Sequence, residues 1–316
     1  MSKQHLHFDF PTQSVFYMLR DHVVVRVEGG LGNQLFQYAA ARSLADRLQS
    51  GLLLDVRGIV ENGDRPYQLD LYHVRAEIAD GQMLDALPPW RSSRGARVRQ
   101  SLSFLMPGMV HSPVFWPRSF AYDDRIERLK QPIYMVGYWQ TERYFAWNRT
   151  RLVQDLTLLP GITGDASWLQ KIKNSNSVSL HVRRGDYVSS PFAAQHHGTC
   201  DMAYYQHAIA SLMQQQSDIQ VFVFSDEPQW AADNLHLPVP AHIVDANPPE
   251  CGYLDLELMR QCRHHVLANS SFSWWGAWRC EHAGQLVYAP GRWFANPGID
   301  ASDIVPERWQ RLQAVA

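Results

Sequence analysis

The chain has 316 residues, of which 46% are hydrophobic and 19% charged, and its formal net charge is −2. This balance predicts a folded globular protein, because disordered chains have fewer apolar and more charged residues. The charge argues against a nucleic-acid-binding protein, which normally carries a basic excess. The chain has no run of about 20 apolar residues, so no transmembrane segment is predicted. We therefore expect a cytoplasmic protein, with peripheral membrane association left open.

The first regular pattern in the chain is a strand, a glycine-rich turn and a helix. Residues 23–27 are an apolar run, and residues 29–33 contain three glycines. Residues 34–49 then carry small or apolar side chains at three- and four-residue intervals, which is typical of a helix packed on one face. A second apolar run at residues 52–55 completes a unit of two strands joined by a helix.

This turn has nearly the setting of a dinucleotide-binding fingerprint, in which glycines admit a pyrophosphate and an acid binds ribose. Leu35 stands where the third glycine of that fingerprint is expected. A NAD-dependent oxidoreductase is therefore kept only as an alternative. Side chains at the helix start are better suited to hydrogen-bonding the hydroxyls of a ligand in a cleft. The predicted cleft residues are Gly30, Gly32, Asn33 and Gln34.

Residues 81–132 are irregular and rich in proline and arginine. Irregular segments of this length are usually functional or contain unrecognised helices, so we expect one face of a cleft here. A strand is predicted at residues 133–137. A domain boundary is predicted near residue 160, where a Leu-Pro-Gly sequence interrupts the pattern.

Strands and helices alternate regularly beyond residue 160. This order predicts an α/β unit with a parallel sheet covered on both faces. The predicted strands are 178–182, 220–224, 242–244, 265–268 and 286–288, and the predicted helices are 202–214, 254–262 and 272–282.

Two adjacent arginines, Arg183 and Arg184, directly follow the strand at residues 178–182. A guanidinium fork holds carboxylate or phosphate oxygens bidentately, so the pair predicts an anionic ligand. The alternative is a pair of solvated arginines on the surface.

Polar side chains follow other strands of this half and should meet the arginines at the carboxyl edge of the sheet. The last of these clusters also opens a helix, whose N-terminus binds anions, so arginines beside it predict a diphosphate. Ordinary capping by serine remains the alternative for this cluster, and stabilisation of a helix dipole remains the alternative for Asp255. The predicted ligand residues are Ser225, Asp226, Asp255, Ser270, Ser271, Phe272 and Ser273.

No metal site is predicted. Asp255 and Glu257 have the acid-x-acid spacing of metal sites in many nucleotide-sugar enzymes, but they lie in a predicted helix instead of after a strand. The adjacent histidine pairs have no further ligands at a spacing suited to chelation.

Four motifs together resemble bacterial α-1,2-fucosyltransferases of glycosyltransferase family 11. They are GGLGNQLFQYA at residues 29–39, HVRRGDY at 181–187, SSFSWWGAW at 270–278 and PERW at 306–309. The resemblance implies a GT-B-like fold with two Rossmann-like domains facing each other across a cleft. Residues 1–160 would bind the acceptor, residues 161–316 would bind GDP-fucose, and the C-terminal tail would pack back on the N-terminal domain.

The resemblance also implies the reaction. L-Fucose would move from GDP-β-L-fucose to the 2-hydroxyl of a terminal β-galactose, with inversion and without a metal ion or other cofactor, in the biosynthesis of a surface polysaccharide such as O-antigen. A non-catalytic protein that binds nucleotides or glycans is a further alternative.

Roles for individual residues follow from the motifs and from charge. Arg183, with Ser271 beside it, would stabilise the leaving diphosphate. The resemblance implies that Asp255 holds the guanosine, with Asp226 a second candidate, and that Tyr187 lies at the cleft. The candidates for the general base are Asp186 and Glu28, followed by His181.

Overall fold

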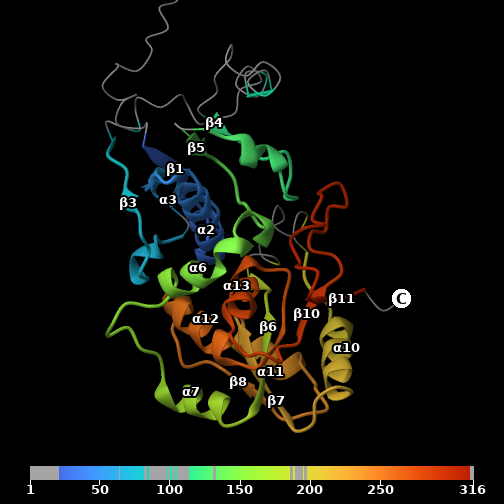
Figure 1. The fold of residues 1–316 in the computed structure, drawn as a ribbon. Helices are drawn as coiled ribbons and strands as arrows, with labels where there is room; N and C mark the ends of the chain where they lie inside the picture. Colours follow the sequence, from blue (N-terminus) through green and yellow to red (C-terminus); the bar gives the residue numbers. More distant parts are fainter. Residues whose placement is uncertain are drawn as a thin grey trace, which may run out of the picture.

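The computed structural model describes residues 21–63, 65–81, 114–130, 133–185 and 198–313, and the single positions 84, 98, 100, 101, 104, 188 and 195. Within these residues the chain forms two parallel β-sheets with helices packed against them (Figure 1). None of the helices formed by these residues is long and apolar enough to cross a membrane.

The N-terminal sheet has five strands in the order β3-β2-β1-β5-β4, and every pair is parallel. The strand order reverses between β1 and β5, which is where open α/β sheets bind ligands. Helix α2 covers one face of this sheet and is followed by β2 and the short helix α3. The bounds are β1 His22–Arg26, α2 Leu31–Leu48, β2 Gly51–Asp55, α3 Arg57–Asn62, β3 Glu77–Ile78, β4 Val114–Phe115 and β5 Ile133–Met135.

Successive side chains of β1 pack on opposite faces of this sheet, and both faces are buried. Val23 and Val25 pack in the core that contains α2, whereas Val24 packs in a separate cluster with Leu53 and Tyr134 on the other face. The period of two in a strand sends successive side chains to opposite faces. A continuous apolar run therefore marks a strand buried on both sides.

The C-terminal sheet has six parallel strands in the order β11-β10-β9-β6-β7-β8. Counted from β6, this is the 3-2-1-4-5-6 order of a Rossmann sheet, and its order reverses between β6 and β9. The strands are β6 Asn176–Val182, β7 Ile219–Ser225, β8 Ala241–Ile243, β9 His264–Val266, β10 Val287–Pro290 and β11 Gln310–Leu312. The helices of this half are α7 Ala166–Lys173, α10 Met202–Met213, α11 Pro228–Asn234, α12 Gly252–Gln261 and α13 Ser271–Arg279, and α6 Arg149–Asp155 precedes them.

The α/β class and the two Rossmann-like sheets confirm the sequence prediction. Strand β11 was not predicted, because its three residues are largely exposed and carry no apolar alternation. The short helices α3, α6, α7 and α11 were not predicted either. Most of residues 81–113 lie outside the described residues, and the boundary near residue 160 stays a prediction.

Helices α2 and α13 pack directly against each other through aromatic side chains. The ring of Phe36 lies 4.4 Å from that of Trp274 and 5.0 Å from that of Trp275. Nε1 of Trp275 donates a hydrogen bond to the carbonyl oxygen of Gly32 at 3.0 Å. The tryptophan pair of the third motif is therefore core, and it joins the two sheets into one packed body.

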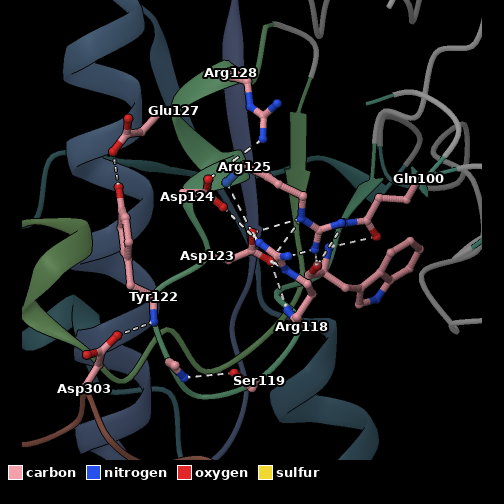
Figure 2. A network of polar contacts seen from close by, with 12 residues as sticks. Gln100, Arg118, Ser119, Tyr122, Asp123, Asp124, Arg125, Glu127, Arg128 and Asp303 are labelled. Carbon is pink, nitrogen blue, oxygen red and sulfur yellow. Dashed lines mark hydrogen bonds and ion pairs between the residues drawn. The ribbon is translucent and has the colours of Figure 1, made fainter. Parts of the chain in front are cut away.

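The loop between β10 and β11 contacts residues that flank β5. Figure 2 shows Asp303 accepting a hydrogen bond from the backbone nitrogen of Tyr122, and Nη1 of Arg143 also lies 2.9 Å from this carboxylate. Next to Tyr122, burial would raise the pKa of Asp123, but hydrogen bonds from Arg125 and Arg118 outweigh burial and hold this pKa well below its usual range. This charge network fixes the segment between β4 and β5.

Candidate active site

Two arginines lie directly after β6, at the carboxyl edge of the C-terminal sheet. Nη1 of Arg183 lies 3.0 Å from Oδ2 of Asp226, the residue that follows β7, and both side chains are 22% exposed. The backbone nitrogen of Arg184 donates to Oδ1 of the same carboxylate at 3.0 Å. One carboxylate therefore positions both residues, and the guanidinium of Arg183 stays partly exposed at the sheet edge.

The close approach of Asp226 requires glycine at position 185. A Cβ built on Gly185 would lie 2.5 Å from Oδ2 of Asp226, well inside van der Waals contact. A side chain here would push the carboxylate away from Arg183.

Arg184 turns toward β7 and α11. Its Nε lies 3.3 Å from Oε2 of Glu227, and its guanidinium carbon lies 3.7 Å from the centre of the Trp230 ring, a cation–π distance. The hydroxyl of Ser225 accepts a hydrogen bond from the backbone nitrogen of Glu227 at 3.0 Å. These contacts hold Arg184 and Ser225 in place, while Asp226 holds Arg183, and both arginine side chains remain partly exposed at the sheet edge.

The serine turn, residues 270–273, begins α13 beside the arginines. The hydroxyl of Ser270 caps the helix by accepting from the backbone nitrogen of Phe272 at 3.3 Å, and the hydroxyl of Ser273 donates to the carbonyl of Ser270 at 3.3 Å. Both serines are buried, whereas Ser271 and Phe272 are partly exposed. The two buried hydroxyls thus build the helix start, and Ser271 and Phe272 are the partly exposed residues of the turn.

The glycine-rich turn of the N-terminal sheet touches this serine turn. A Cβ built on Gly32 would lie 2.5 Å from the carbonyl carbon of Ser271 and 2.6 Å from the backbone nitrogen of Phe272. Only glycine fits at such a distance. The motifs at residues 29–39 and 270–278, far apart in the sequence, therefore meet at the N-termini of α2 and α13.

His181 lies buried at the end of β6, with its ring 5.6 Å from that of Phe272. Burial, assisted by the positive charge of Arg183, lowers the pKa of His181 to about 3. The imidazole is therefore neutral near pH 7 and a weak base. Its packing on Phe272 couples the arginine turn to the serine turn.

Asp255 lies in the first turn of α12, on the side of β8. Burial raises the pKa of its carboxyl group to about 6, although Nδ2 of Asn247 donates a hydrogen bond to Oδ1 at 2.7 Å and counteracts this. The start of α12 also approaches the serine turn, since a Cβ built on Gly252 would lie 3.7 Å from the Phe272 ring. Asp255 is thus a desolvated carboxylate near the predicted diphosphate site.

Glu28 follows β1 at the carboxyl edge of the N-terminal sheet. Its Oε2 lies 3.2 Å from Nε of the buried Arg26, which also contacts Glu61 at 2.8 Å, and the Glu28 side chain is 19% exposed. The ion pair orients the carboxylate while it remains accessible.

The side-chain amides of Asn33 and Gln34, at the start of α2, form hydrogen bonds with neighbouring loops. Gln34 is fully buried, donates to the carbonyls of Gly29 and Pro66 and accepts from the backbone nitrogen of Gln68. Its side chain has no surface with which to contact a ligand. Asn33 is partly exposed, and its Oδ1 accepts a hydrogen bond from Nε2 of Gln140 at 2.7 Å. Gly30 supplies the N-cap of α2.

Two residues of the arginine motif, Asp186 and Tyr187, lie outside the described residues, so their predicted roles stay predictions. Among the residues that the structure does describe, no group of three His, Cys, Asp or Glu side chains is arranged to hold a metal ion.

The sequence profile of Glycosyl transferase family 11 matches residues 122–309, which include the arginine motif, the serine turn and the C-terminal motif. The chain belongs to glycosyl transferase family 11. This membership favours glycosyl transfer over the nicotinamide-dependent oxidoreductase considered from the glycine-rich turn.

Known glycosyltransferases match over most of the chain. It is 32% identical over 301 residues to an alpha-1,2-colitosyltransferase of Escherichia coli, covering 92% of this chain and 99% of that protein. It is 29% identical over 302 residues to the O-antigen biosynthesis glycosyltransferase WbnK of Escherichia coli, covering 90% and 99%. It is 26% identical over 288 residues to the galactoside 2-alpha-L-fucosyltransferase SEC1 of Bos taurus, covering 87% and 67%.

The GT-B-like fold expected for family 11 is confirmed by comparison with solved structures. A mutant of Arabidopsis thaliana FUT1 in complex with GDP matches with a TM-score of 0.50 at 14% identity, over 85% of this chain and 70% of that one. This likeness concerns the fold.

Several residues around the family 11 site were not predicted from the sequence. Gln37 bonds the backbone nitrogen of Glu28 and the carbonyl of Gly137, and it lies four residues after Asn33, so helical periodicity could have indicated it. Gln140 and Trp230 have no short-range signal that could have indicated them.

Proposed function

We propose that this glycosyltransferase transfers L-fucose from GDP-β-L-fucose to the 2-hydroxyl of a terminal β-galactose with inversion, in the biosynthesis of a surface polysaccharide such as O-antigen. The observation that carries the proposal is that Arg183, positioned by Asp226, follows β6 while the serine turn follows the adjacent strand β9, at the point where the order of the C-terminal sheet reverses. The rings of His181 and Phe272, 5.6 Å apart, link the two turns. The names of the bacterial and bovine relatives support the α-1,2 linkage and the surface glycan.

The diphosphate of the donor is proposed to lie between Arg183 and the first turn of α13. Guanidinium groups and helix N-termini both bind phosphate oxygens, and Ser271 is a partly exposed residue with a hydroxyl group at the start of this helix. Negative charge develops on the leaving diphosphate as the bond to fucose breaks. Donors fixed in advance by Asp226 and by the helix cap stabilise this charge without having to reorganise, which is the role that a metal ion fills in other transferases.

Asp255 is proposed to hold the guanine base. An ionised carboxylate accepts hydrogen bonds from the N1–H and the 2-amino group of guanine, a pairing that adenine does not offer. Its desolvated setting strengthens such bonds, and Asn247 fixes the orientation of the carboxylate.

Inversion requires a group that accepts the proton of the attacking hydroxyl on the face of the sugar opposite the leaving group. His181 is a weak base because its pKa is lowered to about 3. We propose Glu28 for this role, since its accessible carboxylate precedes the turn that touches Ser271. Asp186 is the competing candidate.

The decisive experiment incubates the purified chain with GDP-fucose and a panel of β-galactosides in excess chelator. We expect release of GDP and an α-1,2-linked fucosyl product, identified by NMR. An active enzyme that needs an added divalent cation would contradict the proposed role of Arg183. A complete lack of transfer to every β-galactoside would contradict the proposed reaction.

A colitosyl donor is the second candidate, because one similar relative is a colitosyltransferase. Colitose lacks the 3-hydroxyl of fucose, so the two donors differ by a single hydrogen-bonding group. Comparing kcat/KM for GDP-fucose and GDP-colitose decides between them. A site that hydrogen-bonds the 3-hydroxyl should reject the deoxy sugar strongly, because its polar groups would be left unpaired.

A further inference from the structure

The strand order of the N-terminal sheet reverses between β1 and β5, and an exposed aromatic side chain follows β5 at this point. Tyr138 is 37% exposed, whereas the next residue, Trp139, is buried and stacks on Phe115. Tyr138 belongs to no β-strand, and the residues on both sides of it have positive φ angles, 151° at Gly137 and 57° at Trp139. A left-handed conformation is costly for tryptophan. The turn is held in this shape, which buries one ring and presents the other.

The ring of Tyr138 belongs to an aromatic row contributed by both halves of the chain. It lies 6.1 Å from the ring of Phe120, with the two planes within 4° of each other. The ring of Phe120 in turn lies 4.8 Å from that of Phe294, which follows β10 of the C-terminal sheet. Tyr138 is therefore supported from behind and stands where the two halves meet.

Polar groups of the glycine-rich motif converge on the same turn. Oε1 of Gln37 accepts from the backbone nitrogen of Glu28 at 3.0 Å, while its Nε2 donates to the carbonyl of Gly137 at 3.3 Å. One amide group therefore bridges the end of β1 and the residue before Tyr138. The backbone of Glu28 and the residue before Tyr138 are thus held together by a single side chain.

The same turn is linked to the donor side. Nε2 of Gln140 donates to Oδ1 of Asn33, whose neighbour Gly32 touches the serine turn at Ser271. Adjacent Cα atoms are about 3.8 Å apart, so the Tyr138 turn and the start of α13 lie on either side of one helical turn of α2. A ligand on Tyr138 would lie beside a donor bound at Ser271.

We propose that Tyr138 is the platform on which the acceptor galactose stacks, with Asn33, oriented by the buried Gln140, as a hydrogen-bonding partner of its hydroxyls. The inference rests on the proposed function. One face of β-galactopyranose carries the hydrogens of C3, C4 and C5 and is apolar, so it packs on an aromatic ring while the hydroxyls at its edge bond to amides and carboxylates. An aromatic ring beside a few fixed polar groups is a common arrangement for binding a small molecule. This placement turns the 2-hydroxyl toward Glu28 and the donor.

The test compares Tyr138→Ala and Tyr138→Phe with the native chain. Removing the ring should raise the KM for a β-galactoside about tenfold, whereas phenylalanine should keep the KM within about threefold because it retains the ring. The KM for GDP-fucose and the slow hydrolysis of GDP-fucose by water should not change in either variant. Trp147→Ala is the matched control, because Trp147 is also an exposed aromatic residue but lies far from the proposed site. Its neighbour Asn148 bonds Asp46, which is about 20 Å along α2 from Asn33.

Saturation-transfer NMR measures binding of a methyl β-galactoside in the presence of GDP, and so tests the Tyr138 platform separately from the transfer reaction. Galactoside binding that is lost in Tyr138→Ala and kept in Tyr138→Phe supports the platform even if no fucose is transferred, in which case the proposed reaction alone fails. An unchanged KM and unchanged galactoside binding in a folded Tyr138→Ala protein would overturn the platform while leaving the reaction intact.

Discussion

Gly32 and Ser271 are in contact across the junction of the two sheets, at a distance that leaves no room for a side chain at position 32. Each residue lies in the first turn of a helix, so the contact brings two helix N-termini to one place. The hydrogen bond from Trp275 to the carbonyl of Gly32 fixes the same junction. If the two halves bind acceptor and donor as proposed, they depend on this contact to bring the two sugars within bonding distance.

Replacing Gly32 by alanine should therefore separate the two turns and reduce kcat/KM about 100-fold, the order of loss that a displacement of about 1 Å causes in a preorganised site. Steady-state kinetics, with circular dichroism to confirm folding, provide the measurement. Gly81→Ala is the control, because a Cβ at that position has no neighbour within 4 Å. A Gly32→Ala enzyme with native kinetics would show that the contact does not set the geometry of the site.

Arg183→Ala should reduce kcat by about 200- to 1,000-fold while the chain stays folded. If the guanidinium neutralises the leaving diphosphate, its loss should cost roughly 3 to 4 kcal/mol of transition-state stabilisation. Arg183→Lys should recover only part of the rate, because an ammonium lacks the bidentate fork. A loss in kcat of less than about tenfold in Arg183→Ala would assign the stabilising role to another group.

The raised pKa of Asp255 predicts that binding of GDP weakens below about pH 6. Guanine needs the ionised carboxylate, which is the minor form below the pKa. Calorimetric titration with GDP between pH 5 and pH 8 measures the effect, and Asp255→Asn should bind weakly at every pH with a flat profile. A native profile equally flat would remove Asp255 from the guanine site.

The sequence predicted the parts of this site that follow directly from hydrophobic periodicity and from the ends of strands. It did not predict the parts formed where loops distant in the sequence come into contact. The apolar strand before Arg183 and the register that pairs Val182 with Ser225 together place Asp226 beside Arg183. The prediction of a diphosphate site at this edge followed from the same rule about carboxyl ends of parallel strands. The sequence could not decide between capping and ligand binding in the serine turn. The structure shows that the hydroxyls of Ser270 and Ser273 form hydrogen bonds within the first turn of the helix.

The turn around Tyr138 could not be predicted in the same way. Its neighbours Phe120 and Phe294 come from different halves of the chain, and the bond from Gln140 to Asn33 joins residues separated by most of the N-terminal half. No local pattern distinguishes the exposed Tyr138 from the buried Trp139 beside it. The difference arises from backbone conformation, which depends on tertiary packing.

Buried histidines predict acid lability of the fold. Burial lowers the pKa of His265 to about 3 and that of His264 to about 4, from an ordinary value of 6.5. The unfolded chain binds more protons than the native one below pH 6.5, so stability present above that pH is lost as the pH falls, by up to about 1.4 kcal/mol per pH unit for each histidine. Urea unfolding at pH 7.5 and pH 5.0 measures the slope. His265→Gln should reduce this slope, and an equal slope in that variant would contradict the assignment.

Glu28→Gln should separate proton transfer from binding. If Glu28 accepts the proton of the attacking hydroxyl, this isosteric change should lower kcat by about 100-fold or more. The Kd for GDP should remain native, because the proposed guanine and diphosphate contacts belong to the other sheet. The change also removes a charge from Arg26, so circular dichroism and thermal unfolding must confirm a native fold. Asp186→Asn is the parallel variant. A native kcat in Glu28→Gln together with a large loss in Asp186→Asn would transfer the role of base to Asp186. A large loss in Glu28→Ala that formate restores would locate the proton transfer at Glu28, because truncation leaves room for a small carboxylate.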